Sequence, residues 1–139
     1  MALTDVQILE LPRINDPRGN LSFIENGAKC LPFDMARVYW IYDVPGGRMR
    51  HGHAFYATYE LIVALSGSFD VVLSDGTEQR RIHLCRSYTG VYVPAMTWRE
   101  LDNFSTNSVA MVLASSLYDE LDYIRDFEQY KTLMSDAVR

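Results

Sequence analysis

Short stretches rich in β-branched and aromatic residues recur along most of the chain, and turn-forming sequences separate them. The spacing of about 8–12 residues is typical of all-β sandwiches and barrels. Asp16-Pro17-Arg18-Gly19 and Ser74-Asp75-Gly76 are two of the turns. The pattern predicts an all-β jelly roll of mainly antiparallel strands, whose mouth can hold a small ligand. The predicted strands are 6–11, 21–24, 36–42, 57–65, 69–73, 81–84, 90–93, 99–101 and 109–114.

The carboxyl end has a different period. Tyr123, Phe127, Tyr130 and Met134 follow one another at steps of three and four residues, which predicts one terminal helix with an apolar stripe. Ser116 followed by Asp119 resembles a capping box and predicts the helix start. We expect this helix to pack on the outside of the barrel.

The overall composition describes one small globular unit. The chain has 139 residues, 48% of them hydrophobic and 22% charged, and no stretch is typical of a linker, so residues 1–139 are expected to form a single domain. The amino terminus lacks a signal-peptide pattern and no run of eighteen apolar residues occurs, which predicts a cytoplasmic protein without a membrane partner. The net charge of −5 argues against a nucleic-acid partner. Cys30 and Cys85 are interpreted as ordinary thiols.

Two of the three histidines, His51 and His53, stand two positions apart, and on a strand the alternation of side chains would place them on one face. Metal-binding cupins, a group of small β-barrels, begin their metal site with such a pair. Glu60, the next acid, should face away from both histidines unless a bulge intervenes. Arg99 stands where a third ligand is needed, and a guanidinium cannot bind a cation. We therefore expect no tightly bound metal.

Without a metal, a pocket histidine is a candidate general base that removes a proton from carbon beside a carbonyl. His53 is the first candidate, because arginine, tyrosine and a second histidine stand near it in the sequence, and His51 is the second. His83 has no such companions and is predicted to be a surface residue.

Six stretches, taken in order, resemble the thymidine-diphosphate-sugar (dTDP-sugar) 3,4-ketoisomerases. They are DPRGNL (16–21), RVYWIYD (37–43), GHA (52–54), LSGSF (65–69), YVPA (92–95) and YDELDYIRD (118–126). The resemblance implies a cupin-type jelly-roll barrel with one C-terminal helix, which forms a homodimer and needs no cofactor. It also implies an isomerase of deoxyamino-sugar biosynthesis, which moves the ketone of a dTDP-linked 4-keto-6-deoxyhexose from C4 to C3 through an enediol.

The resemblance assigns the carbon base to His53 and places Phe55 where the family has a second histidine that moves protons between the two sugar oxygens. Phenylalanine has no exchangeable proton. Tyr39, Tyr56 or His51 would then take over the oxygen relay, with Tyr39 favoured. The alternatives are an enzyme for a different keto sugar, a barrel that only binds a nucleotide sugar, and a metal-dependent oxygenase.

The remaining expected contacts are with the substrate. By the resemblance, Arg18 and Arg99 face the sugar, but they match opposite product classes, so the configuration at C4 stays unassigned. Arg37 and Arg50 are candidates for the diphosphate, because a guanidinium fork fits phosphate oxygens. Tyr56 and Tyr92 complete the predicted substrate-binding set.

Overall fold

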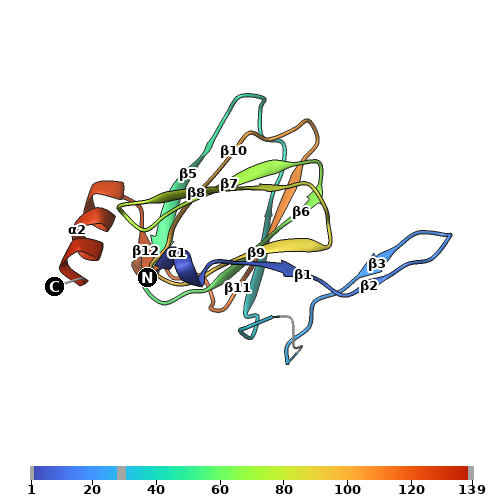
Figure 1. Ribbon diagram of the computed structural model, residues 1–139, viewed down its shortest axis with the longest axis horizontal. Coiled ribbons are helices and arrows are strands. Elements are labelled where there is room, and N and C mark those ends of the chain that lie inside the picture. The colour runs from blue at the N-terminus through green and yellow to red at the C-terminus, as the bar shows by residue number, and fades with distance from the viewer. Residues whose placement is uncertain (1, 28–30, 138–139) are drawn as a thin grey trace.

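The computed structural model describes residues 2–27 and 31–137, without the side chains of Ala2, His51 and Ala137. Two five-stranded antiparallel sheets face each other (Figure 1), in the orders β1-β9-β6-β11-β4 and β12-β5-β10-β7-β8. This arrangement confirms the all-β jelly-roll prediction. The first sheet consists of β1 (Gln7–Glu10), β9 (Thr89–Val93), β6 (Glu60–Ser66), β11 (Val109–Ala114) and β4 (Arg37–Ile41). The second consists of β12 (Tyr123–Ile124), β5 (Arg50–Phe55), β10 (Trp98–Asp102), β7 (Phe69–Ser74) and β8 (Gln79–Leu84).

The core lies between the two sheets and follows the alternation of each strand. In β6, for example, Ile62 and Ala64 point inward, while Leu61 and Val63 point to the outer face of the sheet. The inner cluster consists of Val6, Ile62, Ala64, Phe69, Val71, Leu73, Ile82, Leu84, Val91, Val93, Leu101, Phe104, Ala110 and Val112. Because these side chains fill the middle of the barrel, a ligand site has room only at its mouth.

Strand β5 contains a bulge that decides which of its residues face inward. Arg99 of β10 pairs with His53, but Leu101, two residues further on, pairs with Arg50, three residues back. Arg50 and His53 therefore share the inward face. The alternation argument for His51 and His53 cannot be applied across this bulge, and the side chain of His51 lies outside the described residues.

Gly52 allows the two strands to approach each other at the bulge. A Cβ at this position would lie 2.5 Å from both Trp98 Nε1 and Glu100 Cγ, on the outward face of β10. Any side chain at position 52 would push β5 away from β10. The glycine thus helps to hold His53 beside Arg99.

The terminal helix begins later than predicted. Helix α2 spans Phe127–Ala137, and Tyr123 lies instead in β12, paired with Phe55. The predicted capping box is wrong as well, because Asp119 caps a short 3-10 turn, η1 (Glu120–Asp122). Backbone pairing with the edge of β5 overrides the helical spacing of the side chains. The predicted position of the helix is correct, since α2 packs on the outside of the barrel through Phe127 and Tyr130 (Figure 1).

The amino-terminal part is the least compact region of the fold. Helix α1 (Ala2–Asp5) precedes β1, and the short hairpin of β2 (Arg13–Ile14) and β3 (Leu21–Ser22) projects away from the barrel (Figure 1). Ile14 and Leu21 on this hairpin are exposed. Within the described residues, no helix is both long and apolar enough to cross a membrane.

Candidate functional site

A cavity of about 420 Å³ opens between the two sheets. It receives residues from β4, β5 and β10 and from the segment around β12. The lining residues are Tyr39, Ile41, Met49, Arg50, His53, Arg99, Tyr123 and Arg125. Three arginines and two tyrosines among eight residues give the cavity a positive and hydrogen-bonding character, which suits an anionic ligand.

Arg99 and Glu60 form a buried ion pair behind the cavity. Arg99 is 3% exposed and Glu60 1%, and Arg99 Nε donates to Glu60 Oε1 at 3.0 Å. Arg99 Nη2 also donates to the Tyr39 hydroxyl at 2.7 Å, and that hydroxyl donates to Glu60 Oε2. Burial opposes the charge on Arg99, but the nearby Glu60 carboxylate raises its pKa, so the guanidinium stays charged. No hydrogen bond among the described residues uses Arg99 Nη1, which leaves this donor for a ligand in the cavity.

The prediction that Glu60 faces away from the histidines is wrong. The chain leaves β5 at Phe55 and enters the other sheet at Glu60, the first residue of β6. The alternation of one strand does not continue across residues 56–59, where the chain changes sheets. Glu60 lies on the same face of β6 as Ile62 and Ala64 and therefore points between the sheets.

His53 is buried against aromatic rings on the wall of the cavity. Its ring lies 4.8 Å from that of Phe55 and 5.0 Å from that of Tyr123, measured between centroids. His53 Nε2 is buried and has no hydrogen-bond partner among the described residues. Burial, together with the positive charge of Arg99 and other arginines, lowers the pKa of His53 to about 2. The imidazole is therefore neutral near pH 7, which is the form that accepts a proton.

Three further arginines surround His53. Besides Arg99, the residues that lower its pKa electrostatically are Arg125, Arg37 and Arg50. Arg37 Nη1 donates to the Tyr123 hydroxyl at 3.4 Å, and Arg125 lies over the Tyr123 ring at 4.1 Å while it pairs with Glu120. Four cations around a neutral base form a site for a ligand that carries several negative charges.

Sequence reasoning missed Tyr123 and Arg125, although both line the cavity. Both fall in the 118–126 stretch that carries the resemblance, but the helical spacing assigned this stretch to an outer helix. The signal that points to them is the stretch DYIRD (122–126). Tyrosine and isoleucine favour a β-strand, and in a strand Tyr123 and Arg125, two positions apart, face the same side.

The structure brings Tyr39, His53, Arg50 and Arg99 to one cavity, with Arg37 beside it. The other predicted substrate-binding residues lie elsewhere in this chain. Tyr92 packs on the outer face of the first sheet, where its ring stacks on Phe33 at 6.1 Å, because Val91 and Val93 take the inward positions of β9. Within this chain, Tyr92 therefore lies outside the set of residues that lines the cavity.

Tyr56 and Arg18 also lie away from the cavity. Tyr56 follows the last residue of β5 and is 45% exposed. The Arg18 side chain is 90% exposed on the projecting hairpin and pairs with Asp16 at 2.9 Å. Within this chain, neither residue belongs to the set that lines the cavity.

The residues expected to have no catalytic role are exposed. His83 is on the surface as predicted, but the expectation that it lacks a companion is wrong, since its Nδ1 lies 2.6 Å from Asp70 Oδ1. Cys85 is an exposed free thiol, and Cys30 lies outside the described residues. Among the residues that the structure describes, no three His, Cys, Asp or Glu side chains come together as a metal site requires.

The low pKa of His53 predicts an acid-sensitive contribution to stability. An unfolded histidine titrates near 6.5, so the contribution is intact above that pH and is lost progressively as the pH falls from 6.5 towards 2. Between pH 7 and pH 5 the free energy of unfolding of the wild type should fall by about 2 kcal/mol more than that of His53→Asn. Urea denaturation of both proteins at the two pH values measures this difference, and equal pH dependence would contradict the burial of a neutral imidazole.

Comparison with known proteins places this chain in a family. The family model described as "FdtA: WxcM-like, C-terminal" matches residues 4–135. TDP-4-oxo-6-deoxy-α-D-glucose-3,4-oxoisomerase of Aneurinibacillus thermoaerophilus is 40% identical over 125 residues, which are 90% of this chain and 89% of the relative.

Solved structures agree with this match and confirm the predicted cupin-type jelly roll. The sugar 3,4-ketoisomerase QdtA of Thermoanaerobacterium thermosaccharolyticum, in complex with TDP, superposes with a TM-score of 0.93 at 33% identity over 99% of each chain. A 3,4-ketoisomerase from Helicobacter canadensis gives a TM-score of 0.91 at 36% identity and covers 95% of this chain and 98% of its own. These matches confirm the resemblance seen in the sequence to the sugar 3,4-ketoisomerases. The chain belongs to the FdtA family.

Proposed function

We propose that this protein is a single-domain sugar-nucleotide 3,4-ketoisomerase, which moves the ketone of a TDP-linked 4-keto-6-deoxyhexose from C4 to C3. The observation that carries the proposal is a buried, neutral His53 on the wall of a cavity ringed by arginines. Its 40% identical relative is named as an oxoisomerase of this kind. The TDP complex of QdtA supports the choice of nucleotide.

His53 performs the carbon steps in this proposal. A ketone at C4 acidifies the C3–H bond, and the imidazole takes that proton to leave an enediolate. The charged Arg99 stabilises the negative charge that develops on O4 through its free Nη1. Because the surroundings of His53 disfavour its charged form, the imidazolium returns the proton readily, now to C4. The electrons stay within the sugar, so the reaction needs no metal or organic cofactor.

The nucleotide is held by the remaining arginines in this proposal. Arg37, Arg50 and Arg125 lie around His53 and are the candidates for the diphosphate. Diphosphate binding would place negative charge among these cations and fix the sugar beside the base.

The pathway follows from the chemistry. A 3-keto sugar is the substrate that a sugar aminotransferase needs to make a 3-amino sugar. We therefore assign the protein to deoxyamino-sugar biosynthesis in the cytoplasm, where nucleotide-activated sugars are made.

The test follows hydrogen exchange at carbon in heavy water. TDP-4-keto-6-deoxyglucose is incubated with the protein, and the C3 position of the sugar is observed by NMR. Wild type should introduce deuterium at C3 of the remaining 4-keto sugar and form the C3 ketone, and His53→Asn should slow both by at least about 100-fold, the usual contribution of a general base. Substrate binding without either reaction would instead support a barrel that only binds nucleotide sugars, as the loss of the second family histidine at Phe55 would allow.

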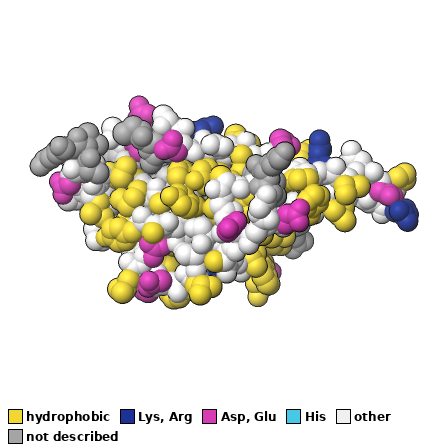
Figure 2. Space-filling view, turned by 90° about the horizontal axis from the view of Figure 1, so that it is seen from below, with side chains coloured by type: hydrophobic (Ala, Val, Ile, Leu, Met, Phe, Trp, Pro, Cys, Tyr) yellow, Lys and Arg dark blue, Asp and Glu magenta, His cyan; other side chains and the backbone are white. Residues whose placement is uncertain are grey.

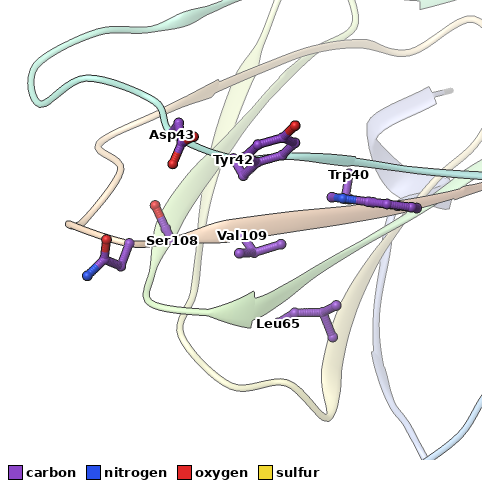
Figure 3. Close-up of a pocket in the computed structure, with 7 residues that line it drawn as sticks. Trp40, Tyr42, Asp43, Leu65, Ser108 and Val109 are labelled. Carbon is purple, nitrogen blue, oxygen red and sulfur yellow. The ribbon is translucent and has the colours of Figure 1, made fainter.

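The outer face of the first sheet supports the further proposal of a homodimer. Val38 and Trp40 of β4, and Tyr42 directly after it, are exposed there, with exposed fractions of 49%, 59% and 61%. Trp40 and Tyr42 line a groove of about 510 Å³ together with Leu65 and Val109 (Figure 3). Seen from below, hydrophobic side chains gather over the body of the molecule and continue onto the projecting hairpin (Figure 2). Exposed apolar side chains that gather on one face are typical of a protein interface.

The projecting hairpin gives this dimer a role in the site. Arg18 lies on the hairpin, away from the cavity of its own chain. We place each hairpin against the other subunit of this dimer, an arrangement in which Arg18 meets the substrate in the cavity of the partner.

Sedimentation velocity at micromolar protein concentration tests the dimer. The wild type should sediment as a dimer and Trp40→Glu as a monomer, because the substitution buries an unpaired charge in the interface. Leu121→Glu is the matched control, since Leu121 is 86% exposed on η1 and lies outside that surface. A wild-type protein that sediments as a monomer would contradict the proposal.

A further inference from the structure

Moving a ketone from C4 to C3 requires proton transfers at oxygen as well as at carbon. The O3 hydroxyl must lose its proton and O4 must gain one, and His53 is occupied with the carbon proton. Phe55, at the place of the second family histidine, cannot transfer a proton. It is 4% exposed and packs its ring against that of Tyr123, which lines the cavity, at 4.6 Å between centroids.

Tyr39 is a hydroxyl on the cavity wall with a proton acceptor behind it. Its oxygen accepts from Arg99 Nη2 and donates to Glu60 Oε2. Glu60 is 1% exposed and does not line the cavity. Among the described residues, Tyr39 is the hydroxyl group that lines the cavity and is hydrogen-bonded to Glu60.

The charges around Tyr39 prevent it from holding a negative charge by itself. Burial raises the pKa of its hydroxyl, the Arg99 cation opposes this shift, and the Glu60 carboxylate adds to it. Tyr39 can accept a proton from a sugar hydroxyl only if its own proton leaves at the same time. The atom placed to receive that proton is Glu60 Oε2.

We infer that Glu60 is a positioning residue that acts through Tyr39, as the proton-holding end of a relay between the two sugar oxygens. The inference rests on the proposed function and adds the oxygen steps to it. Arg99 keeps both groups in place, because it donates to the Tyr39 oxygen and to both carboxylate oxygens of Glu60.

The relay balances as follows. In the first half the O3–H bond breaks and a new Tyr39 O–H bond forms, while the former Tyr39 proton moves to Glu60 Oε2. In the second half Glu60 returns that proton to Tyr39, and Tyr39 gives its own proton to O4. Glu60 is neutral only between the two halves, and no oxidant, reductant or co-reactant is needed. Carbon exchange at C3 does not depend on either half, since the Arg99 cation can hold the enediolate.

A purely structural role for Glu60, as counter-ion of Arg99, predicts a different result. Loss of a counter-ion would disturb Arg99 and so slow deprotonation at C3 and formation of the C3 ketone together. Loss of a relay would slow only formation of the ketone. Measuring both rates on one sample separates the two roles.

The experiment compares Glu60→Gln with wild type in heavy water, with TDP-4-keto-6-deoxyglucose as the probe. Glutamine keeps the shape and can still accept from Arg99, but it cannot take a proton from Tyr39. Deuterium entry at C3 should stay within about threefold of wild type, while formation of the C3 ketone should fall by at least about 100-fold. Tyr39→Phe should show the same split. TDP affinity and the thermal unfolding midpoint of each variant report whether the cavity and the fold are kept.

Two results would overturn the relay. One is ketone formation by Glu60→Gln within tenfold of wild type, and the other is an equal fall of both rates in a variant that still binds TDP. If Glu60→Gln does not fold, Tyr39→Phe decides by the same two rates. A wild-type protein that neither exchanges C3 nor forms the ketone would refute the proposed function itself, which is a different outcome.

Discussion

The buried ion pair between Arg99 and Glu60 is the interaction on which the site depends. It joins β10 of one sheet to β6 of the other at the mouth of the barrel. Taking a guanidinium and a carboxylate out of water is costly, and removal of one partner from such a pair typically destabilises a protein by about 3–5 kcal/mol. The pair persists because Tyr39 satisfies a further donor of Arg99 and a further acceptor of Glu60. The three residues thus form one hydrogen-bonded unit. Among the described residues, no hydrogen bond uses Arg99 Nη1, and Arg99 lines the cavity.

The same unit sets the chemistry of its neighbours. Burial in a poorly solvated wall, together with the fixed Arg99 cation, keeps the His53 imidazole neutral, which is the form that accepts a proton. The Arg99 cation also keeps the Tyr39 hydroxyl close to Glu60. The bulge in β5, which Gly52 allows, brings Arg50 to the same inward face as His53. Carbon chemistry and oxygen chemistry can then proceed on two groups that share one arginine, in a barrel that has a phenylalanine at position 55.

Local sequence patterns predicted most of the strands and the turns, because these depend on alternation and on the few residues that permit a reversal. They failed where the outcome depended on long-range pairing. Glu60 was placed wrongly because the chain changes sheets before β6. Tyr123 was assigned to a helix because its spacing to Phe127 is helical, whereas pairing with β5 makes it a strand residue. Arg18, expected to face the sugar, lies on the projecting hairpin, and no local pattern specifies where a hairpin sits relative to the barrel.

The most direct test of the account is the structure of His53→Asn with TDP-4-keto-6-deoxyglucose bound. The account predicts that C3 of the sugar lies within about 3–3.5 Å of the position taken by the His53 ring in the wild type, the distance expected of reacting atoms. O4 should then point to Arg99 Nη1, with the Tyr39 hydroxyl within hydrogen-bond distance of the sugar oxygens. A sugar bound outside this cavity, or one whose C3 faces away from residue 53, would contradict the assignment of His53 as the carbon base.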